Sequence, residues 1–180
     1  MAAGNTYTPI SSQTLSSNTN TITLNSFSGY TDLHIVISYF TNGDGDDLLQ
    51  LNGSGGTAYE QMELTSYSSA SSGGVATFKA YNFSGQSSFR CTGGLGQSAS
   101  TIPAIIDLYI PLYANTSTYH YVFGSYGTGS QALASSTTYA HDLWQGQWKN
   151  TSAITSLTIS RASNLYLIGT TISLYGIQEA

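Results

Sequence analysis

Hydrophobic and polar residues alternate along most of this chain with the two-residue period of β-strands. Residues 32–40, DLHIVISYF, show it most clearly, with one apolar face made of Leu33, Ile35, Ile37 and Tyr39. Strict alternation of this kind is typical of a strand with one face in the core. We expect this segment to form a central strand.

Ten further segments are short, rich in β-branched or aromatic residues, and separated by Gly, Ser and Asn clusters. They are residues 21–27, 47–51, 59–67, 75–83, 87–91, 104–113, 119–127, 154–160, 165–169 and 170–177. In YAHDLWQGQWKNTSAI, residues 139–154, the glycine disfavours a helix, and we interpret the region as a strand followed by a loop.

About ten short strands without helices cannot form a parallel sheet, because parallel strands need long crossover connections. The pattern therefore predicts an all-β protein, an antiparallel β-sandwich of about ten strands, and within that class a jelly roll. We divide the chain into an N-terminal arm, residues 1–10, and a single β-sandwich domain, residues 11–180.

Charged residues make up 7% of the 180 residues, against about 25% in an average soluble protein. The four Lys and Arg residues are scattered singly, so no basic stripe is present and nucleic acid is not an expected partner. No run of 18 apolar residues and no signal-peptide pattern occurs, so we expect no membrane contact and synthesis in the cytoplasm. The single cysteine, Cys91, is expected to be buried.

The acidic stretch TNGDGDDLLQLNGSGG carries Asp44, Asp46 and Asp47 within four positions. These carboxylates either bind calcium or belong to a turn between two strands. An EF-hand count from Asn42 fits Asp44 and Asp46 but fails at the required Gly and Glu positions. Asp and Gly are also common in tight turns, because they tolerate left-handed backbone angles. We favour the turn, keep calcium as the alternative, and predict no metal or other cofactor.

Catalytic patterns are weak. The histidines, at positions 34, 120 and 141, lack the spacing of a metal site. His141 and Asp142 invite a triad with one of many serines, but no GxSxG motif selects a nucleophile. Glu60, Glu63 and Asp107 lack a pattern for glycoside hydrolysis, and we place the two glutamates on the solvent side of a strand. We therefore predict that the protein is not an enzyme.

The chain contains 14 Tyr, 6 Phe and 2 Trp. Most of these aromatics are expected to cover the sheets, since Tyr pairs well across strands. Trp144 and Trp148 are the best candidates for a glycan-binding platform, because they are large, close together and flanked by Gln145 and Gln147.

Five segments carry a resemblance. They read YTPISSQTLSSNTNTITLNSFSGYTDLHIVISY, LLQLNGSGGTAYEQMELTSYSS, IDLYIPLYANTSTYHYVFG, LWQGQWKNTSAITSLTIS and GTTISLYGI. Together they resemble a family of virion proteins of tailed bacteriophages, which share an opening strand ending "tyTdL", an "lWrstsaItsitit" stretch and a terminal "GStftLYGI". The resemblance runs from about Tyr7 to Ile177. Gln50 and Gln145 stand where the family often has a charged residue, so salt bridges made there by relatives do not carry over.

The resemblance implies a virion structural protein, assembled in the host cytoplasm. The first expectation is a capsid decoration or cement protein, a homotrimer that binds the major capsid protein or other virion proteins and reinforces the shell. The alternative is the receptor- or glycan-binding tip of a tail or head fibre. In the family pattern, residues 42–47 fall in a variable loop, which agrees with the turn.

Overall fold

The computed structural model describes residues 7–43, 45–69, 76–92, 102–133 and 136–178, and within them it contains twelve strands and no helix. The strands are β1 (Tyr7–Thr14), β2 (Thr21–Asn25), β3 (Asp32–Tyr39), β4 (Asp47–Leu51), β5 (Tyr59–Ser69), β6 (Ala76–Gln86), β7 (Phe89–Arg90), β8 (Ala104–Ile110), β9 (His120–Leu133), β10 (Ser136–Trp148), β11 (Ser156–Arg161) and β12 (Thr171–Ile177). The described residues thus contain no helix that is apolar and long enough to cross a membrane.

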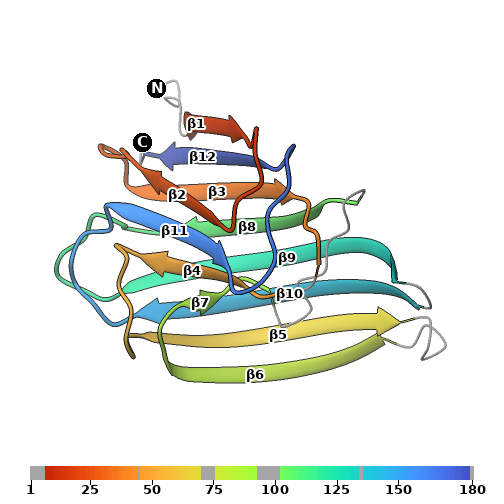
Figure 1. Cartoon of the computed structure of the whole chain (residues 1–180). Helices are drawn as coiled ribbons and strands as arrows, with labels where there is room; N and C mark the ends of the chain where they lie inside the picture. Colours follow the sequence, from red (N-terminus) through yellow and green to blue (C-terminus); the bar gives the residue numbers. More distant parts are fainter. Residues whose placement is uncertain (1–6, 44, 70–75, 93–101, 134–135, 179–180) are drawn as a thin grey trace, which may run out of the picture.

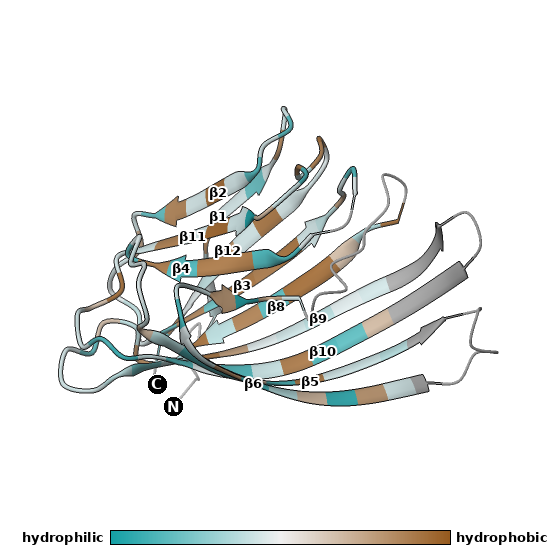
Figure 2. Ribbon diagram, turned by 60° about the horizontal axis from the view of Figure 1, so that its bottom comes forward, coloured by the Kyte–Doolittle hydropathy of each residue, from teal (hydrophilic) through white to brown (hydrophobic). Residues whose placement is uncertain are grey.

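The strands form two antiparallel sheets. The large sheet has eight strands in the order β1-β12-β3-β8-β9-β10-β5-β6, and the small sheet has four in the order β2-β11-β4-β7. The small sheet lies in front of the large sheet in Figure 1, and Figure 2 shows the two as separate layers. We call the face of the large sheet toward the small sheet its inner face, and the opposite one its outer face. The predicted antiparallel β-sandwich is confirmed.

The core lies between the two layers, and the alternation of the sequence decides which residues enter it. In β3, residues 33, 35, 37 and 39 are fully buried while the residues between them are partly exposed, as the pattern predicts. β11 and β12 alternate in the same way, and Leu157, Ile159, Ile172 and Leu174 join the core. Cys91 is also buried, as expected.

Consecutive strands from β2 to β5 alternate between the sheets. Such wrapping is a feature of jelly rolls, and assignment to that class stays a prediction. The strand count is higher than the predicted ten. One reason is β1, since residues 7–10 were assigned to an arm but pair with β12, with Tyr7 opposite Ile177. Residues 7–10 thus belong to the large sheet, residues 1–6 lie outside the described residues, and the division of the chain into an arm and one domain stays a prediction.

Residues 165–169 do not form the strand that their apolar run predicted. Tyr166 instead makes isolated bridges to Thr19 and to Thr41, and its side chain is fully buried. The segment therefore connects the turn after β11 to the core, and it brings the Tyr166 hydroxyl to the start of β4.

Candidate functional site

Asp47 is the centre of a buried polar cluster. It is the first residue of β4 and has no exposed surface. Its carboxylate accepts hydrogen bonds from the hydroxyls of Tyr39 and Tyr166, each at 2.7 Å, and from Arg161 Nη1 at 2.8 and 3.0 Å. Arg161 lies directly opposite Asp47 in the β4–β11 ladder, and its side chain is also fully buried. The sequence favoured a turn between two strands for Asp47; the structure makes it the first residue of β4, as the predicted strand 47–51 has it, with its carboxylate in the core.

The Arg161 guanidinium bonds to the kinds of oxygen atom that a calcium ion uses. Nη1 donates to the Asp47 carboxylate, and Nη2 donates to the backbone carbonyls of Gly43 and Gly45, both at 3.1 Å. Carboxylate and carbonyl oxygens are typical calcium ligands. In this loop, the positive charge beside these oxygen atoms is therefore supplied by the Arg161 side chain from β11.

Asp46 points elsewhere. Its carboxylate forms a partly exposed ion pair with Arg90 Nη2 at 3.0 Å, and the Arg90 guanidinium lies over the Phe83 ring. Asp44 lies outside the described residues. Asp46 and Asp47 thus have different arginine partners, and no three His, Cys, Asp or Glu side chains gather in the described part of the chain.

The buried cluster changes the acidity of its members. Burial raises the pKa of Tyr39 and that of Tyr166 well above the usual value, and the nearby Asp47 carboxylate raises both further. Burial raises the pKa of the Cys91 thiol in the same way, with Asp47 again adding to the effect. These hydroxyls and this thiol therefore stay protonated at neutral pH, which makes the cluster a structural feature and gives no nucleophile.

Trp144 and Trp148 do not form an exposed sugar-binding platform. Both point to the inner face from β10 and are at most 5% exposed. Trp144 packs against Phe89 with ring centroids 5.6 Å apart, and Trp148 stacks on Tyr59 and on His120. The expectation that they bind glycans through exposed rings was wrong, because alternation along β10 turns both side chains into the core.

Most catalytic candidates are separated by the sheet. His141 is exposed while Asp142 is buried, since neighbours on a strand face opposite sides, so the imagined triad does not form. Glu63 is buried on the inner face, where Thr65 Oγ1 donates to it at 2.6 Å, so its predicted solvent-facing position was wrong. Burial also raises the pKa of Glu63, against the opposing effect of the Thr65 hydroxyl.

The remaining histidine and glutamate candidates each have a partner. His34 Nε2 lies 3.0 Å from Asp107 Oδ1 across β3 and β8, and Glu60 pairs with Lys149. His120 is buried, with Nε2 2.9 Å from the Ser152 carbonyl oxygen, and burial lowers its pKa. These contacts fix the side chains to the sandwich.

The outer face carries a group of large apolar side chains that sequence reasoning did not single out. Its members come from four adjacent strands and are each between 42% and 78% exposed: Met62, Leu64, Phe78, Phe123 and Leu143. We call this group the apolar patch. Register places Leu64 beside Leu143, and Gln145 lies between Met62 and Phe123. The available signal was in β5, where Met62 and Leu64 alternate with the polar residues Gln61, Glu63 and Thr65, although the structure buries the polar set.

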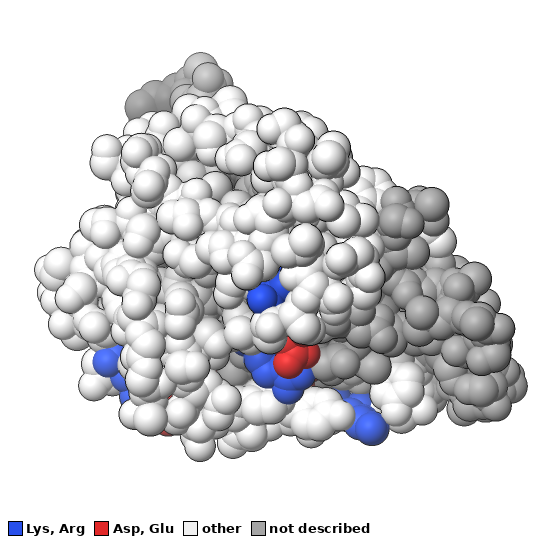
Figure 3. All heavy atoms as spheres, viewed as in Figure 1, with Lys and Arg blue, Asp and Glu red and all other residues white. Residues whose placement is uncertain are grey.

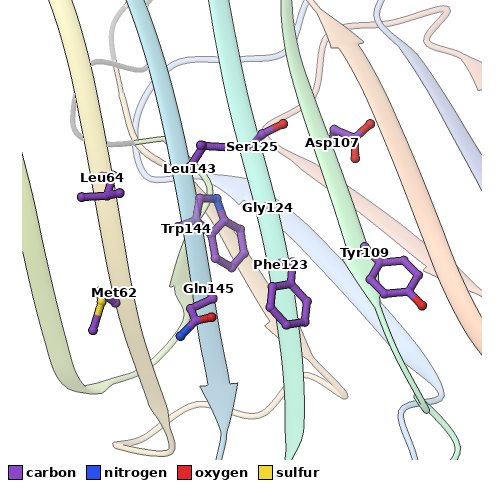
Figure 4. Close-up of a pocket in the computed structure, with 10 residues that line it drawn as sticks. All are labelled: Met62, Leu64, Asp107, Tyr109, Phe123, Gly124, Ser125, Leu143, Trp144 and Gln145. Carbon is purple, nitrogen blue, oxygen red and sulfur yellow. The ribbon is translucent and has the colours of Figure 1, made fainter.

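A hollow of about 570 Å³ lies in this face. Figure 4 shows its walls, which come from β5, β10, β9 and β8 and include Met62, Leu143 and Phe123 on one side and Asp107 and Tyr109 on the other. Its floor includes Gly124, which has no side chain, and Ser125, which has a small one. A second hollow of about 460 Å³ adjoins it between Leu64 and Phe78.

Charge is scarce on the outer face, as on the rest of the protein. Asp107 and Glu60 lie beside the apolar patch on this face, with His34 and Lys149 as partners, and Lys79 and His141 are among the residues that line the second hollow. Lys79 in β6 faces the inner side, where its ammonium lies 5.4 Å from the centre of the Tyr67 ring. On the side of the small sheet, Figure 3 likewise shows few charged atoms. The surface available for contact is therefore apolar, aromatic and amide in character.

No protein-family model matches this chain, and no curated protein is similar to it.

Proposed function

We propose that this protein is a bacteriophage virion structural protein, a capsid decoration or cement protein that binds the shell and reinforces it. The sequence resemblance to phage virion proteins from Tyr7 to Ile177 supports the virion context. The all-β sandwich is compatible with it, since two packed sheets form a rigid unit that suits permanent assembly. On this proposal, the partners are the major capsid protein or other virion proteins, with three copies around one axis.

The observation that carries the proposal is the apolar patch on an almost uncharged sheet face. Exposed apolar patches of several hundred Å² mark contact surfaces on soluble proteins. A surface low in Lys and Glu also loses little side-chain entropy when it is covered. Such a face suits a protein that stays bound in an assembly, whereas an enzyme would need a converging set of polar groups.

A receptor- or glycan-binding role at a fibre tip is the second candidate. Burial of Trp144 and Trp148 removes the residues on which that role was based. The outer-face hollow is the observation that favours it now, because Phe123 offers a ring beside the polar groups of Asp107 and Gln145. The lining of the hollow is mainly apolar, so we place this role second.

The test is the number of copies of this protein per purified particle, measured by quantitative mass spectrometry against the major capsid protein. A decoration or cement protein should be present at about one copy per few capsid subunits. Particles that lack the protein should release their genome at a lower temperature than complete particles. A handful of copies per particle would contradict the shell role and favour the fibre tip.

A further inference from the structure

The apolar patch is of a size that is often functional on soluble proteins, and it has properties that suit contact with itself. We propose that a second copy of this chain covers the outer face of the large sheet, so that two sandwiches pack face to face through Met62, Leu64, Phe78, Phe123 and Leu143. The inference rests on the proposed function in one respect only, that the protein works in an assembly, and it gives the purified chain a two-fold contact in place of the three copies around one axis that the resemblance implies.

Area is the first argument. If a large side chain has roughly 200 Å² of surface, five side chains exposed by 42% to 78% present about 550 Å² of apolar surface. A standard protein interface buries about 800 Å² on each partner. The patch alone provides most of that, and Gln145 and Tyr121 on the same face extend it.

Charge is the second argument. When identical surfaces meet about a two-fold axis, every charge near the axis meets a like charge, so a self-contact favours a face without charges. The apolar patch contains none. The nearest acids, Asp107 and Glu60, lie at its border and have partners of their own. A foreign partner guided by charge would have nothing to recognise here, whereas a second copy meets no repulsion.

Shape is the third argument. Phe78 on the edge strand β6 is 78% exposed and is the most prominent side chain of the patch. The larger hollow lies over β9, on the other side of the Leu64–Leu143 pair. The protruding ring and the hollow are therefore separated by the centre of the patch, which is the arrangement that a self-complementary surface requires.

A two-fold axis along the strands, between β5 and β10, satisfies this shape. It places β6 of each copy over β9 of the other, because the sheet order is β9-β10-β5-β6. Each Phe78 then lies over β9 of the other copy, level with Gly127 and next to the end of the hollow at Ser125, and Leu64 meets Leu143. Sheets commonly pack with their strands nearly aligned, about 10 Å apart.

The experiment is sedimentation equilibrium of the purified full chain at micromolar concentrations. We expect the wild type to be a dimer, and Leu143→Asp to raise its dissociation constant about 100-fold or more, because a charge would be buried at the centre of the contact. Phe78→Ser should weaken the dimer as well. Ser12→Asp is the matched control, since it adds the same charge to the outer face at the far edge, in β1, and should change nothing.

Thermal melting of each variant checks that it is folded. If Leu143→Asp does not fold, the dissociation constant of Phe78→Ser tests the contact instead. A wild-type monomer, or an oligomer that all three variants leave intact, would overturn the inference. A trimer that Leu143→Asp dissociates would support a contact between copies on this face and overturn its two-fold arrangement. Because the purified protein is used, the inference can fail while the copy number in particles still supports the virion role.

Discussion

Replacement of Asp47 by Asn tests the most unexpected feature of the structure, an acidic residue of a Gly-rich stretch that is buried beside an arginine. The substitution keeps the size of the side chain and removes its charge. Arg161 then remains in the core with no carboxylate, and the hydroxyls of Tyr39 and Tyr166 lose a charged acceptor. We expect a large loss of stability.

The magnitude follows from burial, since neither side chain of the Asp47–Arg161 pair has exposed surface. Removing one partner of a buried ion pair costs about 3–5 kcal/mol, mainly because the other charge stays buried and uncompensated. A domain has a free energy of unfolding of about 5–15 kcal/mol, so the variant should lose a large fraction of its stability.

The assay is urea unfolding followed by circular dichroism, with Asp46→Asn as the control. Asp46 is the preceding residue and also pairs with an arginine, but that pair is about a third exposed, so its loss should cost no more than about 1 kcal/mol. An Asp47→Asn variant within about 1 kcal/mol of wild type would refute the reasoning. The double variant Asp47→Leu, Arg161→Met should recover part of this loss, because it removes both buried charges but also removes the acceptor of the Tyr39 and Tyr166 hydroxyls.

Three further outcomes are expected. The raised pKa values of Tyr39 and Tyr166 mean that the folded state holds these protons more tightly than the unfolded state. Their stabilising contribution is complete below about pH 10, the pKa of the unfolded state, and is lost as the pH rises toward the higher pKa of the folded state, so the urea midpoint should begin to fall near pH 10 and continue to fall above it. Gly124→Ala should cost about 1–3 kcal/mol in thermal unfolding, because its Cβ would overlap the Trp144 ring, whereas Gly127→Ala, whose Cβ would lie 4.0 Å from its nearest neighbour, should be nearly neutral. The melting temperature should be the same in calcium and in chelator, because Asp46 and Asp47, the two described aspartates of the loop, already form ion pairs with arginines. A melting temperature that falls in chelator and is restored by calcium would instead indicate a metal site.

Much of the fold could be read from the chain because a β-strand imposes a period of two on its side chains. The alternation in β3, β11 and β12 predicted both the strands and their buried faces. Where the pattern was less clear the prediction failed. Strand β1 was missed because its Ser and Thr residues contribute little to the core, and its pairing with β12 is made by backbone atoms.

The roles of individual side chains were harder to predict, because they depend on which strands become neighbours. The Gly-rich acidic stretch by itself indicates a turn. Only the folded chain shows that Arg161, 114 residues later, lies opposite Asp47 and pairs with it. In the sequence Trp144 and Trp148 resemble a binding platform, but in the structure both side chains lie on the covered inner face of β10. In β5 the alternation would place Met62 and Leu64 inside, but the structure buries Gln61, Glu63 and Thr65 instead.

Composition and local pattern by themselves determined the fold class, the lack of basic surface and the burial of every second residue in the clearest strands, since these follow from backbone geometry and solvation. Tertiary structure alone decided that Asp47 is part of the core, that both tryptophans are inside, and that Met62, Leu64 and Leu143 remain on the outside. The physical reason is that alternation shows which side chains share a face of a strand, but strand pairing and the position of the second sheet decide which face is covered. In β5 the covered face is the one with Gln61, Glu63 and Thr65, and the face with Met62 and Leu64 stays outside.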